Sequence, residues 1–174
     1  MADLNNKNIA IIATDGFEDS ELTSPKEAVE AAGAATRVIS TESGEIEGKK
    51  GAKVAVDELT ADAKVEDFNA LILPGGTVNS DTIRIDKDAV ALVKAFKDAD
   101  KPIGVICHGG WILTEADVIN GVKLTSVENV KTDLVNAGAN WVDEEVVVDS
   151  GFISSRTPDD LPAFNAKIVE EFAK

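Results

Sequence analysis

The chain has few of the residues that build disulfides and zinc sites. Its 174 residues contain one cysteine, Cys107, and one histidine, His108. A single cysteine excludes an intramolecular disulfide and is typical of a protein from a reducing compartment. Zinc sites made from these residue types usually need about three or four of them. No EF-hand loop and no G-x-G-x-x-G after the first strand is present either, so we expect no metal and no cofactor.

Long hydrophobic runs and basic residues are also scarce. The first apolar segment, Ile9–Ala13, is too short for an export signal or a membrane span, so we expect a cytoplasmic protein without a membrane partner. Lys and Arg number 17 against 32 Asp and Glu, a formal net charge of −15. Such a charge repels nucleic acid, which we therefore exclude as a partner. The length and the 44% hydrophobic content predict one globular domain over residues 1–174.

Buried strands alternate with helices along the chain. The apolar runs predict strands at Asn8–Ala13, Thr36–Ile39, Ala70–Leu73, Ile103–Ile106, Val122–Thr125 and Phe152–Ser155, with two short strand-like pieces in Trp141–Val148. Helices are predicted from Ser24-Pro25 to Gly33, over Asp86–Ala99, from Trp111, over Val130–Ala137 and over Asp159–Ala173. The segment Thr41–Asp57 is predicted to form a hairpin or a small excursion at the sheet edge. This order predicts a doubly wound, three-layer α/β sandwich: a mostly parallel sheet with helices on both faces.

The stretch Lys101–Glu115 (KPIGVICHGGWILTE) has the pattern of a nucleophile elbow. A buried strand ends at Cys107, two glycines permit a sharp turn, and a helix follows. The N-terminus of that helix would favour the thiolate, so we expect a low thiol pKa. The alternative is that Cys107 is a small buried hydrophobic residue.

Three loops should meet at the carboxyl edge of the sheet, where such folds bind ligands. They are Asp15–Asp19, Pro74–Asn79 and Cys107–Gly110. The glycines of the second loop suit a backbone oxyanion hole, for which we expect the N–H groups of Gly76 and His108. The Pro-Gly-Gly sequence is equally compatible with a simple turn.

These motifs resemble the PfpI family of intracellular proteases. The matching segments are Asp15–Glu21 (DGFEDSE), Leu73–Thr77 (LPGGT), Asp81–Arg84 (DTIR), Ile106–Trp111 (ICHGGW), Thr132–Val148 and Ser155–Leu161 (SRTPDDL). The superfamily includes the parkinsonism-associated deglycase and resembles class I glutamine amidotransferases, which implies a flavodoxin-like fold. One departure is Gly110, where the family more often has proline.

The resemblance implies roles for four residues. Cys107 would be the nucleophile and Glu18 the carboxyl beside its sulfur, so that the two titrate together. His108 would be a base or orienting group, with Asp81 of an adjacent subunit as its acidic partner. A homodimer, or a hexamer, would then be required. Without the resemblance, Glu18 could be a solvated loop acid and His108 a packed side chain.

Three functions stay open on these residues. The first is a stress-protective enzyme acting on glyoxals or their adducts, in which Cys107 attacks a small carbonyl substrate. The second is an intracellular cysteine peptidase, and the third a redox-sensing or chaperone-like protein in which Cys107 is only oxidised. Glutamine amidotransfer is disfavoured because its triad takes a histidine late in the chain, and none follows His108.

Overall fold

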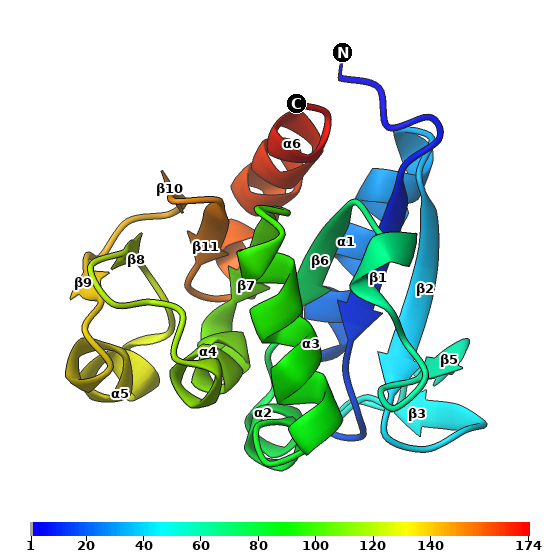
Figure 1. Ribbon diagram of the computed structural model, residues 1–174, viewed down its shortest axis with the longest axis horizontal. Helices are drawn as coiled ribbons and strands as arrows, with labels where there is room; N and C mark the ends of the chain where they lie inside the picture. Colours follow the sequence, from blue (N-terminus) through cyan, green and yellow to red (C-terminus); the bar gives the residue numbers. More distant parts are fainter. Residues whose placement is uncertain (1) are drawn as a thin grey trace.

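A seven-stranded sheet forms the centre of the computed structural model, which describes residues 2–174. Its strands, in spatial order, are β10 (Val147–Asp149), β11 (Phe152–Ser155), β7 (Ile103–Ile106), β6 (Ala70–Leu73), β1 (Asn8–Ile12), β2 (Ala35–Ser40) and β5 (Glu58–Leu59) (Figure 1). All neighbours are parallel except β10, which runs antiparallel to β11. The predicted mostly parallel sheet is confirmed.

Helices cover both faces of this sheet. α1 (Asp19–Ala31) and α6 (Leu161–Phe172) lie on one face. On the other face lie α2 (Thr77–Ile83), α3 (Lys87–Asp98), α4 (Trp111–Ala116) and α5 (Lys131–Asn136). The fold is therefore the predicted three-layer α/β arrangement. No helix within residues 2–174 is long and apolar enough to cross a membrane.

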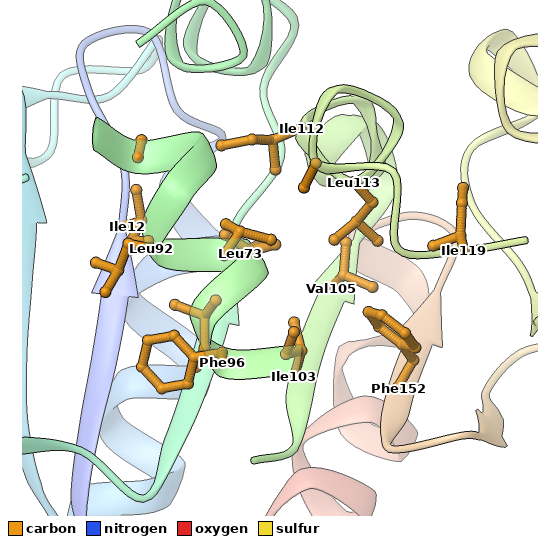
Figure 2. Packing of buried hydrophobic residues seen from close by; sticks show 14 of the residues in the cluster. Ile12, Leu73, Leu92, Phe96, Ile103, Val105, Ile112, Leu113, Ile119 and Phe152 are labelled. Atoms are coloured by element: carbon orange, nitrogen blue, oxygen red, sulfur yellow. The ribbon is translucent and has the colours of Figure 1, made fainter. Parts of the chain in front are cut away.

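Alternating side chains of the central strands feed two separate cores. In β6, Leu71 and Leu73 join the core under α3 and α4, while Ala70 and Ile72 join the core under α1 and α6. Figure 2 shows the first core, in which Leu73 and Val105 pack below Ile112 and Leu113 of α4. Because both faces are covered, β6 and β7 are apolar throughout, which is why their ends could be predicted to the residue.

Two small sheets flank the main one. β3 (Glu45–Glu47) and β4 (Lys53–Ala55) form the predicted antiparallel hairpin. β8 (Lys123–Leu124) and β9 (Asn140–Trp141) form a separate parallel pair. Short 3-10 turns lie at Val65–Asp67, Cys107–Gly110, Glu128–Val130 and Pro158–Asp160.

Two helices differ from the predictions. α1 begins at Asp19, not at Pro25, and passes through Pro25, which cannot donate a hydrogen bond to the carbonyl of Glu21. Leu22, Pro25 and Val29 are all buried on one side of this helix, so packing outweighs the local preference of proline. α2 was not predicted at all, because its sequence TVNSDTI lacks an apolar stripe.

Candidate active site

Cys107 lies at the predicted turn between β7 and α4. Its φ is +59°, a left-handed conformation that is rare for a residue with a side chain. A Cβ on Gly109 would lie 2.6 Å from the carbonyl oxygen of Leu73, so glycine is needed for the loop to pass β6. The Cys107 side chain is partly exposed. The strand–turn–helix geometry of a nucleophile elbow is thus confirmed.

The carboxyl beside the sulfur belongs to Glu21, not to Glu18 as predicted. Glu21 is fully buried, and its Oε1 accepts the N–H of Gly75 at 3.0 Å. Cys107 lies beside the same carboxyl group, since Glu21 Oε1 and Cys107 Cβ both flank Gly75, and Oε2 of Glu21 has no hydrogen-bond partner among residues 2–174. A Cβ on Gly75 would clash with Glu21 Oε1 and lie 2.9 Å from Cys107 Cβ. Gly75 therefore permits the contact between the two side chains.

Glu18 instead binds two lysines of the β3–β4 hairpin. Its Oε2 lies 2.5 Å from Lys49 Nζ and its Oε1 lies 2.9 Å from Lys50 Nζ. Oε1 has no partner with hydrogen-bond geometry among residues 2–174, so its contact with Lys50 is an ion pair. Burial opposes ionisation, but both lysines hold the pKa of Glu18 below its usual value. Glu18 is thus a paired anion near the site and not the partner of the thiol.

Glu21 and Cys107 influence each other's ionisation. Burial, together with the charge of Glu18, raises the pKa of Glu21 to about 7. Burial and the charge of Glu21 raise the pKa of the Cys107 thiol to about 12. The expected low thiol pKa is therefore wrong in direction, because a helix of six residues does not offset burial and a neighbouring carboxylate. When the pair holds one proton, a thiolate exists only while that proton lies on Glu21.

His108 turns back toward the sulfur. Its Nδ1 lies 3.3 Å from Cys107 Sγ, and its Nε2 lies 3.3 Å from Thr77 Oγ1 at the start of α2. The left-handed conformation of Cys107 accompanies this direct contact between neighbouring residues. Burial and the charge of Lys49 lower the pKa of His108, so at neutral pH the ring carries one N–H.

Trp111 holds the imidazole from the side. The two rings meet edge to face, with centroids 5.4 Å apart and an interplanar angle of 69°. The indole N–H donates to Asp133 Oδ2 at 2.8 Å, and the guanidinium of Arg84 lies 5.3 Å from the centroid of the indole ring. Arg84 in turn pairs with Glu115 at 2.8 Å. Three helices and the segment after α2 therefore fix the orientation of His108.

The remaining predicted residues lie close to the site. Gly75 N–H is occupied by Glu21, whereas Gly76 N–H, with φ +94° at that residue, donates to no acceptor among residues 2–174. Asp81 is exposed on α2 and forms no hydrogen bond or ion pair with His108 of its own chain within residues 2–174. Arg156 binds Asp160 at 2.9 Å and Asp143 at 2.9 Å.

Sequence reasoning missed Glu21, Thr77 and the two lysines. A signal for Glu21 existed: Phe17, Glu21, Pro25 and Val29 recur at four-residue spacing, the pattern of one helix face. The sequence predicts a helix that begins after Ser24, so Glu21 is assigned to the preceding loop and not to a buried helix face. Within the described residues, no group of three His, Cys, Asp or Glu side chains could hold a metal ion.

Comparison with known proteins identifies one family and several relatives of this chain. The model of the DJ-1/PfpI family matches residues 7–171. An uncharacterized protein of Staphylococcus saprophyticus is 52% identical, over 95% of this chain and 97% of its own. The Bacillus subtilis protein named "Putative cysteine protease YraA" is 45% identical, over 92% of this chain and 95% of its own. A two-domain protein of Anabaena variabilis, with DJ-1/ThiJ/PfpI-like and ferritin-like domains, superposes with a TM-score of 0.92 at 31% identity. That match covers 94% of this chain and 49% of the other, so this chain spans about half of that protein.

Proposed function

Because this chain belongs to the DJ-1/PfpI family, we propose that it is a stress-protective, cysteine-dependent enzyme that acts on glyoxals or on the adducts they form. The observation that supports this most is the position of the Cys107 sulfur. It lies on a strained elbow between a buried carboxyl, Glu21, and the Nδ1 of His108 at 3.3 Å. A nucleophile, a proton-accepting group and an orienting group are the parts that carbonyl addition requires.

The proposed reaction needs no external oxidant. The thiolate of Cys107 bonds to the aldehyde carbon of a 2-oxoaldehyde, and the N–H groups of Gly76 and His108 bind the oxygen that becomes negative. Glu21, which holds the proton lost by the thiol, first gives it to this oxygen. Its carboxylate then removes the proton from the aldehyde carbon and returns it to the adjacent carbonyl carbon, while the hydroxyl proton moves from the first oxygen to the second. The first carbon is thereby oxidised to a thioester and the second reduced to an alcohol. Water then cleaves the thioester, which releases a 2-hydroxy acid and restores the thiol.

His108 acts as an orienting donor in this scheme. Its neutral ring has one N–H, which the scheme assigns to Nδ1, 3.3 Å from the sulfur, so that Nε2 accepts from Thr77. The proton removed from the substrate therefore goes to Glu21, whose pKa of about 7 suits proton transfer near neutral pH. Glu18, held by two lysines, takes no part in proton transfer.

The test is a turnover assay with two matched glutamate variants. Methylglyoxal loss and lactate formation are measured for wild type, Cys107→Ser, Glu21→Gln and Glu18→Gln. We expect no turnover in Cys107→Ser, a loss of at least about a hundredfold in kcat for Glu21→Gln, and a much smaller effect for Glu18→Gln. Lactate formation at the wild-type rate by Cys107→Ser would contradict the proposal.

A peptidase is the second candidate, because the B. subtilis relative is named as a cysteine protease. Peptide cleavage uses the same nucleophile but must also protonate an amine leaving group and bind an extended chain. A fluorogenic peptide library assayed with wild type and Cys107→Ser distinguishes the two activities. Cys107-dependent peptide cleavage without methylglyoxal turnover would favour the peptidase.

A further inference from the structure

Two exposed lysines lie beside the thiol site, where they pair with Glu18, in a chain of strongly acidic composition. Lys49 and Lys50 lie in the turn of the β3–β4 hairpin, and their ammonium groups bind the two oxygens of Glu18 at 2.5 Å and 2.9 Å. The net charge of the whole chain is −15. Acidic residues outnumber basic ones in this chain, so two adjacent lysines that share one carboxylate are a local exception to its charge.

Hydrogen bonds hold the hairpin turn against the start of α1. Asp19 Oδ1 accepts the N–H of Lys50 at 3.0 Å, and Asp19 Oδ2 accepts the N–H of Ala52 at 2.9 Å. Lys49 N–H donates to the carbonyl of Phe17 at 2.9 Å. A Cβ on Gly48 would clash with Asp19, so the turn packs tightly on the start of α1. The lysine backbone is thus held against the helix turn that carries Glu21.

The charges are arranged in two layers. The side chains of Lys49 and Lys50 are 53% and 68% exposed, whereas that of Glu18 is 8% exposed and Glu21 is fully buried. The positive charge of Lys49 interacts electrostatically with Cys107, Glu21 and His108. An incoming molecule therefore meets the cations before it meets the acids. Each ammonium group has three N–H donors, and Glu18 provides one carboxylate for both groups, so donors remain for a second anion.

We propose that Lys49 and Lys50 form a carboxylate-binding subsite at the entrance of the thiol site, so that the preferred carbonyl substrate carries a carboxylate. The carboxylate of Glu18 already demonstrates the ligand chemistry, because the two ammonium groups bind one of its oxygens each. A substrate carboxylate would bind to the outer side of the same ammonium groups, with its carbonyl carbon toward Cys107. The existence of the subsite is independent of the reaction, whereas its role in substrate choice rests on the proposed function.

Alkylation of Cys107 by two similar reagents tests the subsite without turnover. Iodoacetate carries a carboxylate and iodoacetamide is neutral, and both alkylate the same sulfur, the only one from cysteine in the chain. The ratio of their rate constants cancels any change in the thiolate fraction, because that fraction affects both reagents equally. We measure this ratio for wild type, for Lys49→Gln/Lys50→Gln and for Lys87→Gln/Lys94→Gln. The last variant removes the same charge from exposed positions of α3.

The subsite predicts a ratio of iodoacetate to iodoacetamide that is about three- to tenfold higher in wild type than in Lys49→Gln/Lys50→Gln. The α3 variant should keep most of the wild-type ratio, and added salt should lower the ratio in wild type more than in Lys49→Gln/Lys50→Gln. Equal ratios in wild type and Lys49→Gln/Lys50→Gln would overturn the proposal. An equal loss in the α3 variant would also overturn it, because net charge would then suffice.

Turnover separates the subsite from the proposed function. Methylglyoxal is compared with a 2-oxoaldehyde that has a carboxylate at its far end. We expect Lys49→Gln/Lys50→Gln to raise KM for the anionic substrate several-fold while KM for methylglyoxal changes little. If wild type converts neither compound, the proposed function fails and the alkylation ratio still decides the subsite. If both are converted with the same KM in wild type and in Lys49→Gln/Lys50→Gln, the role in substrate choice is refuted.

Discussion

Glu21 has two effects on Cys107 that a single substitution can separate. Its charge opposes formation of the thiolate, and its oxygen accepts the N–H of Gly75. Glutamine at this position keeps an oxygen acceptor but loses the charge, so we expect Glu21→Gln to lower the pKa of the Cys107 thiol by about one unit or more. The measurement is the iodoacetamide rate against pH, with Glu18→Gln as the control. A shift in Glu18→Gln as large as that in Glu21→Gln would contradict the assignment.

The same residue makes stability depend on pH. The pKa of Glu21 rises from 4.5 to about 7 on folding, so its contribution is most favourable below pH 4.5 and is lost as the pH rises to about 7. This shift corresponds to roughly 3 kcal/mol. We expect Glu21→Gln to gain about 2–3 kcal/mol relative to wild type between pH 5 and pH 8. Urea unfolding at both pH values measures this, because the other titrating groups are common to both proteins. A pH-independent difference would contradict it.

His108 can be observed without assignment ambiguity, because it is the only histidine. The proposed function predicts the tautomer with the proton on Nδ1, donating to the sulfur, and with Nε2 accepting from Thr77. We expect Trp111→Leu to lose this preference, since the ring loses its edge-to-face contact. Imidazole ¹⁵N chemical shifts report the tautomer, and Trp141→Leu is the matched control. Unchanged shifts in Trp111→Leu would show that Trp111 does not position the ring.

At the scale of the elements, two adjacent glycines of the elbow should respond in opposite directions. Gly110 has φ −69° and ψ −15°, and a Cβ there would lie 3.4 Å from a methyl of Leu134, an ordinary contact. Gly110→Ala should therefore raise the free energy of unfolding by about 0.5–1 kcal/mol, by restricting the unfolded chain. Gly109→Ala should lower it, because its Cβ would lie 2.6 Å from the carbonyl oxygen of Leu73. Chemical unfolding of both variants tests the contrast, and a loss of stability in Gly110→Ala would refute it.

The sequence predicts best those strands that are buried on both faces. β6 and β7 are buried on both faces, so a continuous apolar run defined their ends. α1 was placed six residues late because Pro25 resembles a helix start, whereas burial of Leu22 and Val29 carries the helix through it. The predicted acid, Glu18, came from the resemblance to the PfpI family, whereas a helix that begins at Asp19 buries Glu21. The roles of Lys49 and Lys50 could not be predicted from the sequence, because only tertiary contacts bring the hairpin turn close to Glu18 and the thiol site.

At the scale of the whole molecule, α2 and the turn after it leave two large apolar side chains uncovered. Val78 on α2 is 62% exposed, with Asp81 and Thr82 on the same side of the helix, and Ile85, two residues beyond the end of α2, is 77% exposed. Large apolar side chains that stay exposed on neighbouring segments are typical of contact surfaces. The helix also begins with Thr77, which contacts His108. A second chain bound here would lie next to the active site and would present its own Asp81 toward it.

We therefore predict that the chain forms at least a homodimer through α2. Sedimentation at micromolar concentration should give a mass of at least twice 18.3 kDa for wild type. Val78→Asn/Ile85→Asn should shift the protein toward the monomer, because it removes the apolar contact without adding charge. The control, Val135→Asn/Val148→Asn, changes two other exposed apolar residues and should leave the mass unaltered. If Asp81 acts on His108 of the neighbouring chain, the monomeric variant and Asp81→Asn should lose activity to a similar extent. A wild-type monomer with full activity would refute both the interface and the role of Asp81.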